Sequence, residues 1–279
     1  MSNAKTGDHA IWFQGPETEK ILITSSVIAI LTGVAFVAGI FDGIAGGGGL
    51  IVLPALLLAG LDPLSALATN KLQGSFGTGS AALEYARHGH IDLRKCRLIV
   101  VTTFLAACLG AFAVRYAPIA FLSAAMPILL IVMALYFAFS PRISNVDVHA
   151  RTTLPKFAWT AAPAIGFYDA IFGPGAGSFY LLGFVTLLGY GVIRASAHTK
   201  LLNFTSNFAA FLMFALSGKM VWILGLSMGV GQFLGARLGA RLAIKNGAQL
   251  IRPLVVIVCC GMAIKLLLDP TNPLRVFFP

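Results

Sequence analysis

Two lysines stand inside apolar stretches, where a charged side chain is costly. Lys71 lies in ALATNKLQGSF and Lys200 in ASAHTKLLNFTSN, each near the start of a long apolar segment. An ammonium group with nearby hydroxyl, amide and imidazole groups suits an oxyanion, so the lysines are predicted to clamp an anionic substrate. The alternative is that each lysine extends to the polar edge of the apolar layer. The neighbouring polar candidates are Thr69, Asn70, Gln73, His198, Thr199 and Asn203.

A glycine-rich break precedes each lysine. The first is Gly46-Gly47-Gly48-Gly49, and the second, GPGAGS, contains Gly175, Gly177 and Ser178. Glycine and proline interrupt the helical hydrogen-bond ladder, which leaves unpaired N–H groups at the start of the next helix. Such a helix N-terminus attracts anions. Close helix packing is the alternative, but the occurrence of two breaks at equivalent places favours a substrate site.

Asp42 and Asp169 each precede a break by four residues. Their neighbours are apolar, so both are expected to be lone buried carboxylates. A buried carboxylate that gains and loses a proton suits proton coupling. The same carboxylate could instead cap the broken helix beside it. The residues leave these two interpretations open.

These groups recur because the chain repeats itself. Gly39–Lys71 reads GIFDGIAGGGGLIVLPALLLAGLDPLSALATNK, and Gly166–Lys200 reads GFYDAIFGPGAGSFYLLGFVTLLGYGVIRASAHTK. Duplicated units with paired helix breaks are typical of secondary transporters. We therefore expect a polar N-terminal segment, a first transmembrane repeat, a polar linker, a second repeat and a C-terminal tail. Their ranges are 1–20, 21–139, 140–156, 157–268 and 269–279.

Composition places the chain in a membrane. It is 58% hydrophobic and 11% charged, whereas charged residues make up about a quarter of a soluble domain. The predicted fold is all-α, a polytopic helical bundle of eight to ten hydrophobic segments in a bacterial inner membrane, crossing it several times. The expected segments are 21–41, 50–61, 64–86, 97–116, 119–139, 157–172, 177–190, 195–217, 220–242 and 250–268.

Two of these segments, 50–61 and 177–190, are too short to cross about 30 Å comfortably. They are expected to be half-helices that line a cavity. If they cross, the two repeats are inverted; if they do not, the repeats are parallel. We favour inverted repeats, because alternating access commonly uses that symmetry.

The charge distribution and the cysteines exclude several classes of function. The net charge of +10 comes from loop residues such as Arg94, Arg142 and Lys245, which fits the positive-inside rule rather than a nucleic-acid surface. Arg237 and Arg241 are expected at the cytoplasmic rim, and Glu84 is expected to pair with Arg87. The four cysteines form no metal or redox motif, so no cofactor or metal is expected. Enzyme motifs such as H-E-x-x-H and G-x-S-x-G are absent.

The residues quoted above, together with EYARHGHIDLRK after the first repeat unit, resemble the sulfite exporter TauE/SafE family of permeases over nearly the whole chain. The resemblance implies export of sulfite or organosulfonates across the bacterial inner membrane. It also implies an eight-to-ten-span bundle. Pro174 and Ala176 interrupt the second glycine run, and Thr199 replaces Asn70. The two half-sites therefore need not bind equally.

The expected function is a secondary transporter of a small sulfur-containing anion, working by alternating access with proton coupling as one option. A passive anion channel and a carrier of another small organic anion remain open alternatives. An intramembrane enzyme is not expected. The expected partners are the anion and membrane lipid, with no nucleic acid, and a homodimer is an open alternative to a monomer.

Overall fold

The computed structural model of the chain describes residues 11–12, 22–114, 116, 146–147 and 149–246. In these residues the helices are accompanied by one two-residue ladder, in which β1 (Ile11–Trp12) pairs antiparallel with β2 (Leu22–Ile23). Apart from this short ladder the described elements are helices, so the all-α prediction is confirmed for the described part of the chain. Segments 119–139 and 250–268, the tail 269–279 and most of 1–20 lie outside the described residues.

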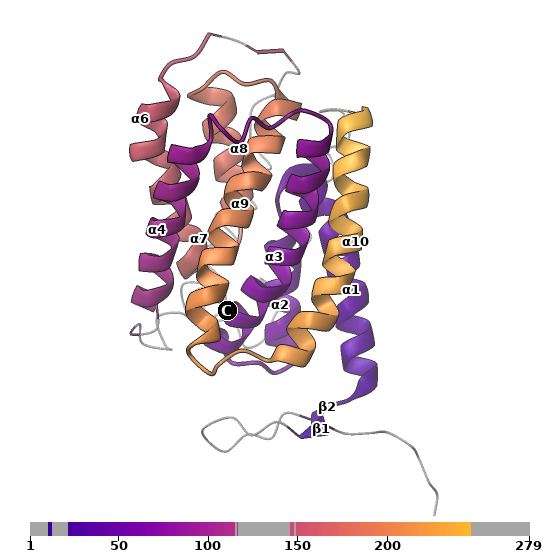
Figure 1. Cartoon of the computed structure of the whole chain (residues 1–279). Coiled ribbons are helices and arrows are strands. Elements are labelled where there is room, and N and C mark those ends of the chain that lie inside the picture. The colour runs from indigo at the N-terminus through magenta and orange to yellow at the C-terminus, as the bar shows by residue number, and fades with distance from the viewer. Residues whose placement is uncertain (1–10, 13–21, 115, 117–145, 148, 247–279) are drawn as a thin grey trace, which may run out of the picture.

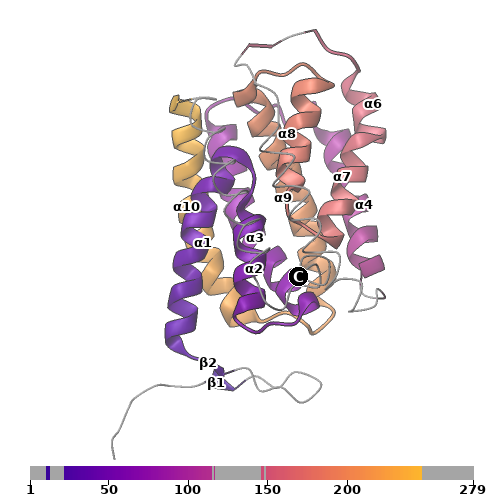
Figure 2. The same cartoon turned by 180° about the vertical axis from the view of Figure 1, so that it is seen from behind.

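The helices form one bundle (Figures 1 and 2). The longest of the described helices, α3 and α10, have 25 residues each, about 37 Å at the rise of an α-helix and enough to cross a bilayer. In chain order the helices are α1 (Ser25–Ala45), α2 (Gly48–Leu58), α3 (Pro63–Arg87), α4 (Arg97–Val114), α6 (Leu154–Trp159), α7 (Ala161–Ile171), α8 (Ala176–Thr186), α9 (Val192–Ala215) and α10 (Trp222–Asn246).

Helices α2 and α8 are the two short arms that the sequence predicts. Each has 11 residues, or about 16 Å, roughly half of a bilayer's apolar thickness. Both follow a glycine in the left-handed conformation. Gly46 ends α1 with φ 79°, and Gly175 precedes α8 with φ 82°. Residues with a Cβ rarely adopt this conformation, so glycine is what allows the chain to turn sharply here.

The expected single segment 157–172 is divided in the structure into α6 and α7. The break falls at Thr160, whose hydroxyl donates to the carbonyl of Lys156 at 2.7 Å. Pro163 has no N–H to donate to the carbonyl of Trp159, so the helical ladder is interrupted at this point.

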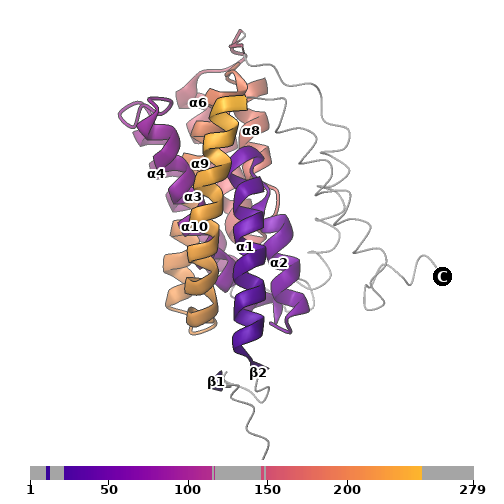
Figure 3. The same cartoon turned by 90° about the vertical axis from the view of Figure 1, so that its right-hand side faces the viewer.

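Helices α1 and α10 lie side by side and run in the same direction (Figure 3). A Cβ at Gly39 would lie 2.7 Å from the carbonyl oxygen of Gln232, and one at Gly43 would lie 2.3 Å from that of Ala236. On α10, a Cβ at Gly235 would lie 2.0 Å from the carbonyl oxygen of Phe36. These glycines permit backbone contact between the two helices, as in many membrane helix pairs.

Helix α3 packs against both α9 and α10. It runs antiparallel to α9, because Gly74 contacts Asn207 while Gly79, further along α3, contacts the earlier residue Phe204. The end of α3 is tied to α10 through Glu84. Its carboxylate accepts from Arg237 at 3.1 Å and Arg241 at 2.8 Å. The expected pairing with Arg87 is therefore wrong, since the structure places two arginines of another helix against this carboxylate.

The bundle is apolar outside and polar inside. On α10, Val230 is 61% exposed, whereas Lys71 is 0% exposed. This reverses the arrangement of a soluble protein, in which charged residues lie outside. Two described helices are also long and apolar enough to cross a membrane: Ser25–Ile44 with mean hydropathy 2.2, and Arg97–Val114 with mean hydropathy 2.1. An apolar environment therefore suits the outer faces of the bundle.

Candidate functional site

The two glycine breaks, far apart in the sequence, meet inside the bundle. The hydroxyl of Ser178, in the first turn of α8, donates to the carbonyl of Gly46 at 2.8 Å. The backbones are so close that a Cβ on Gly177 would lie 3.0 Å from the Cα of Gly46 and 2.7 Å from the amide nitrogen of Asn203. Glycine is therefore required for this close contact as well as for the turn.

A small polar cavity lies where the breaks meet. Its volume is about 30 Å³, room for roughly two water molecules. Carboxylate, amide and hydroxyl groups from α1, α3, α7, α9 and α10 line it together with both glycine breaks. The lining residues are Asp42, Gly46, Gly47, Gly48, Gly49, Asn70, Gln73, Gly74, Thr78, Asp169, Gly173, Gly175, Gly177, Asn203, Asn207 and Gln232.

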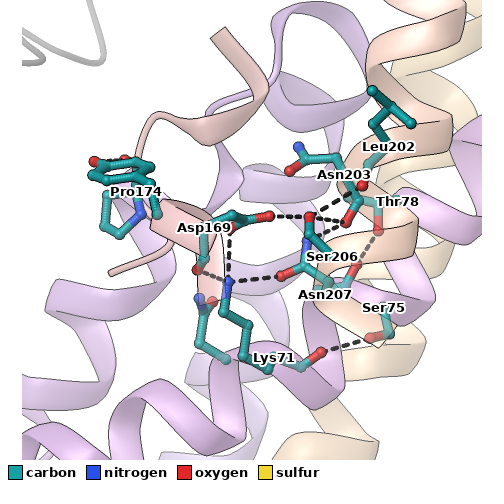
Figure 4. Close-up of polar contacts among 12 residues, drawn as sticks. Lys71, Ser75, Thr78, Asp169, Pro174, Leu202, Asn203, Ser206 and Asn207 are labelled. Carbon is teal, nitrogen blue, oxygen red and sulfur yellow. Dashed lines mark hydrogen bonds and ion pairs between the residues drawn. The ribbon is translucent and has the colours of Figure 1, made fainter. Parts of the chain in front are cut away.

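One buried ion pair joins the first half of the chain to the second beside this cavity. Nζ of Lys71 lies 2.7 Å from Oδ1 of Asp169. The same ammonium donates to the backbone carbonyl of Asp169 and, at 3.2 Å, to Oδ1 of Asn207 (Figure 4). The other carboxylate oxygen of Asp169 accepts from the hydroxyl of Ser206. Both charged groups are thus paired and hydrogen-bonded.

A second ion pair joins the halves in the reciprocal sense. Nζ of Lys200 lies 3.1 Å from Oδ1 of Asp42, with side-chain exposures of 1% and 6%. The N–H of Gly48, at the start of α2, donates to the same oxygen at 3.4 Å. Each aspartate is thus paired with the lysine of the other half.

The expectation of lone carboxylates is therefore wrong, because both aspartates have a lysine partner. The interpretation of Asp42 as a helix cap agrees with the weak bond from Gly48, which the same carboxylate makes beside the ion pair. The four groups carry two positive and two negative charges, so the buried cluster is neutral as a whole. Breaking either pair would leave an uncompensated charge in the interior, which is strongly unfavourable.

Most of the residues predicted for the site lie around the cavity. Both lysines stand behind the carboxylates that line it. Four other predicted residues are engaged elsewhere or lie off the cavity. Thr69 accepts from the N–H of Val221 at 3.2 Å, and the ring of His198 packs against Phe184 and Tyr190. Ser178 bonds to Gly46, and the hydroxyl of Thr199 is buried without a partner.

Some lining residues were missed by the sequence reasoning. Asn207 follows Asn203 by one helical turn, a spacing that places both amides on one face of α9. Gln232 is an isolated amide within the apolar α10. These signals were available, whereas nothing in the sequence distinguishes Gly74 from a packing glycine. Thr78 completes the missed set, whereas Gly173 is the first residue of the GPGAGS break that the sequence analysis quotes.

Two buried amide oxygens around the cavity have no partner among the described residues. The oxygens of Gln73 and Gln232 are both in this state, although the Gln73 nitrogen donates to Asn70 at 2.8 Å. A buried polar atom without a partner is costly unless water or a solute satisfies it. Among the described residues no group of three or more metal-ligating side chains occurs. Both oxygens are acceptors, so a water molecule or another hydrogen-bond donor in the cavity would satisfy them.

A polar cavity between two helix breaks, inside a bundle with apolar outer faces, defines a membrane transport protein. The chain matches the family described as Sulfite exporter TauE/SafE over residues 31–266 and belongs to that family. It is a membrane transporter, not an enzyme.

Three similar proteins are described as probable membrane transporter proteins. The chain is 52% identical to a probable membrane transporter protein, ORF9, of Sinorhizobium sp, over 90% of this chain and 96% of that one. It is 46% identical to the probable membrane transporter protein YfcA of Escherichia coli K12, over 89% and 92% of the two chains. The probable membrane transporter protein YunE of Bacillus subtilis is 21% identical, over 85% and 97%. No solved structure matches the chain.

Proposed function

We propose that the chain exports a small sulfur-containing anion, such as sulfite or an organosulfonate, as a secondary transporter of the bacterial inner membrane. The observation that carries this proposal is the cavity between the glycine breaks, flanked by the crossed pairs Lys71–Asp169 and Lys200–Asp42. Two cationic side chains and the helix N-termini after the glycine breaks surround this small polar space, which would widen as the repeats move and so admit an anion. The family match supports the class of substrate.

The proposed mechanism is alternating access between two inverted repeats. Helices α3 and α9 carry the equivalent lysines yet run in opposite directions, which supports inversion. The packing partners are also equivalent in the two halves. Helix α1 packs on α10, and α7, which corresponds to α1, packs on α4, which corresponds to α10. Rocking one repeat against the other would open the central cavity to each side in turn.

The charge distribution supports a cytoplasmic location for one end of the bundle. Basic residues gather at the starts of α4, α6 and α9 and at the end of α10, and these helix ends lie together at the top of Figure 1. Short loops rich in Lys and Arg stay in the cytoplasm. The exposed apolar faces of the bundle would contact lipid, which makes the protein multi-pass.

Thermal unfolding of the detergent-purified protein against an anion panel tests this proposal. The panel holds sulfite, sulfoacetate, isethionate, thiosulfate, sulfate, phosphate and acetate at one ionic strength. A ligand that binds only the folded protein raises Tm as its concentration rises, by an amount set by RT ln(1 + [L]/Kd). We expect a selective increase in Tm with sulfite or a sulfonate. Equal increases with all anions, or none, would contradict the sulfur substrate class.

Flux measurements in proteoliposomes distinguish the transporter from a passive anion channel. A carrier must change conformation for each anion, so its flux saturates, whereas a channel conducts at far higher rates. We expect saturable flux that responds to a pH gradient. A selective response to acetate or another carboxylate would indicate a carrier of a different small organic anion.

A further inference from the structure

The two crossed ion pairs are unequal, although their lysines occupy equivalent places. Lys71 has three acceptors: the carboxylate and the carbonyl of Asp169, and the side-chain oxygen of Asn207. For Lys200 the described residues offer one acceptor, Oδ1 of Asp42 at 3.1 Å. An ammonium carries three N–H donors. Lys200, with a side-chain exposure of 1%, is therefore a buried cation that makes fewer hydrogen bonds to the described residues than Lys71 does.

The sequence explains the difference. Asn207 and Ser206 on α9 secure the Lys71–Asp169 pair, the first by accepting from Lys71 and the second by donating to Asp169. They stand seven and six residues after Lys200, and the corresponding residues after Lys71 are Thr78 and Gly77. The hydroxyl of Thr78 donates to its own helix at the carbonyl of Gly74, 2.7 Å away. Gly77 has no side chain, so α3 gives the second pair no equivalent support.

Among the described residues, hydrogen bonds reach only one of the two carboxylate oxygens of Asp42. The bonds from Lys200 and from the N–H of Gly48 both end on Oδ1, and among the described residues no hydrogen bond ends on Oδ2. Asp42 lines the cavity, as does Gln232, whose amide oxygen is buried without a partner. A Cβ built on Gly48 would lie 2.8 Å from Asp42 and 2.9 Å from the Gln232 amide nitrogen, which places the two side chains beside each other.

We propose that the anion binds at the Lys200 half-site, where it displaces the carboxylate of Asp42, while the Lys71–Asp169 pair stays closed as an anchor between the halves. This inference rests on the proposed anion transport. Each carboxylate accepts two hydrogen bonds from the described residues, but the second bond of Asp42, from Gly48 at 3.4 Å, is long and weak, whereas the second bond of Asp169 comes from the hydroxyl of Ser206. Lys200 also has fewer acceptors than Lys71 among the described residues, which favours it as the donor to an oxyanion.

Charge balance requires one positive charge to accompany the anion, and we assign it to a proton on Asp42. The cluster is neutral before binding, and a monovalent anion would leave it with a net charge of −1 in a buried site, which is strongly unfavourable. If Asp42 takes up one proton from the solution that supplies the anion, Lys200 pairs with the anion and Asp42 becomes a neutral carboxyl group. One proton therefore binds with each monovalent anion.

The surroundings of Asp42 single out Lys200 as its charged partner among the described residues. On α3, the hydroxyl of Tyr85 donates to the carbonyl of Gly43 at 3.3 Å, and Glu84 is bonded to Arg237 and Arg241 of α10. Helices α2 and α8 carry no charged side chain. On α9, the ring of His198 bonds to the carbonyl of its own helix, and across the cavity Asp169 is paired with Lys71.

Matched variants of the two lysines test the asymmetry without any ligand. Lys71→Met removes a cation with three acceptors, and Lys200→Met removes one with a single acceptor. We expect Lys71→Met to lower Tm by about 5 °C more than Lys200→Met, since two further hydrogen bonds are lost. If Lys71→Met cannot be purified, Ser206→Ala weakens the same pair and is compared with Thr78→Ala. Equal losses, or a larger loss at the Lys200 half-site, would overturn the assignment of the anchor.

Isethionate, a sulfonate whose charge is constant between pH 5 and 8, tests the binding site. We expect it to raise the Tm of the wild-type protein and of Lys71→Met, but not of Lys200→Met. If isethionate still raised the Tm of Lys200→Met, the proposed binding at the Lys200 half-site would be contradicted. If no anion of the panel stabilises the wild-type protein, anion transport itself is contradicted, and the ligand-free comparison still decides which pair is the anchor.

The proton is tested by the pH dependence of isethionate binding. One linked proton makes the apparent affinity rise about tenfold for each unit by which the pH falls. Asp42→Asn mimics the protonated carboxyl group, so this variant should bind isethionate with little pH dependence. Asp169→Asn is the matched control and should keep the pH dependence. The reverse pattern, or a pH-independent wild type, would exclude Asp42 as the proton site.

Discussion

At the scale of single residues, each half of the chain supplies an aspartate and a lysine and pairs neither within itself. Asp42 and Lys71 are closer in sequence than Asp42 and Lys200, yet the structure pairs Asp42 with Lys200 at 3.1 Å. The sequence identified all four charged residues as site candidates. It could not identify their partners, because repetition makes pairing within a half and between halves look alike. Asn207, which distinguishes the two pairs, was quoted as part of a motif but not selected.

Asp147 provides a prediction at this scale, in a loop outside the helices. The backbone N–H of Gly191 donates to its carboxylate at 2.5 Å, and Arg194 pairs with it at 2.8 Å. The Gly191 bond is the main cause that lowers the pKa of Asp147 below its ordinary value, and Arg194 adds to it. A lowered folded-state pKa means that the contact stabilises the fold above the ordinary pKa of an aspartate. This stabilisation is lost as the pH falls through the lowered pKa.

Amide hydrogen exchange at Gly191 measures this contact. Asp147→Asn should increase exchange at neutral pH by on the order of fivefold, since about 1 kcal/mol of local stabilisation is removed. At each pH the wild type and the variant are compared under the same conditions, and their difference should disappear in acid. Unchanged exchange at neutral pH would contradict a stabilising contact between the Asp147 carboxylate and Gly191.

At the scale of helices, glycine has two separate tasks in this molecule. In the breaks it permits left-handed turns and contact between Gly46 and Gly177. In α1 and α10 it permits two long helices to touch along their backbones. The sequence predicted the breaks and the short arms well, since glycine and proline interrupt helices locally. It could not indicate which helix faces the glycines of α1, because that choice depends on the packing of the whole bundle.

Two alanine substitutions distinguish a glycine that permits close helix contact from a glycine that faces open space. Gly235→Ala would place a Cβ 2.0 Å from the carbonyl oxygen of Phe36, so the helices must move apart. We expect a loss of about 1–3 kcal/mol of stability, measured by thermal unfolding in detergent. Gly33→Ala on α1, where nothing lies within 4 Å of the added Cβ, is the control. It should be neutral or stabilise by up to about 1 kcal/mol, because alanine favours the helix. Equal effects would mean that α1 and α10 do not depend on their close contact.

At the scale of the whole molecule, the two ends of the bundle differ in charge. Lys95, 79% exposed at the side chain, precedes α4, and Tyr116, 73% exposed, follows it, so they mark opposite ends of one helix. Composition and hydropathy predicted a membrane bundle and a basic end. The split of α6 from α7 was not predicted, because Thr160 and Pro163 each occur commonly within helices of membrane proteins.

Cysteine labelling tests the proposed orientation. In a variant without its four native cysteines, Lys95→Cys should react with a membrane-impermeant maleimide only in inside-out vesicles. Tyr116→Cys should react in right-side-out cells instead, because the opposite end of α4 would face the periplasm. Labelling of both positions from one side would contradict a membrane-spanning α4, and the reverse pattern would place the basic end outside.

The crossed pairs also bear on how such a molecule could arise. A half-length chain with one aspartate and one lysine in these places would bury two charges without partners. Two copies facing each other in opposite orientations would give each aspartate the lysine of its neighbour, as Asp42 has Lys200 and Asp169 has Lys71. The centre of this chain therefore has the chemistry of a subunit interface. Fusion of two copies would free Thr78 and Asn207 to diverge, so that a single polypeptide could hold the one anchoring and one exchangeable contact proposed above.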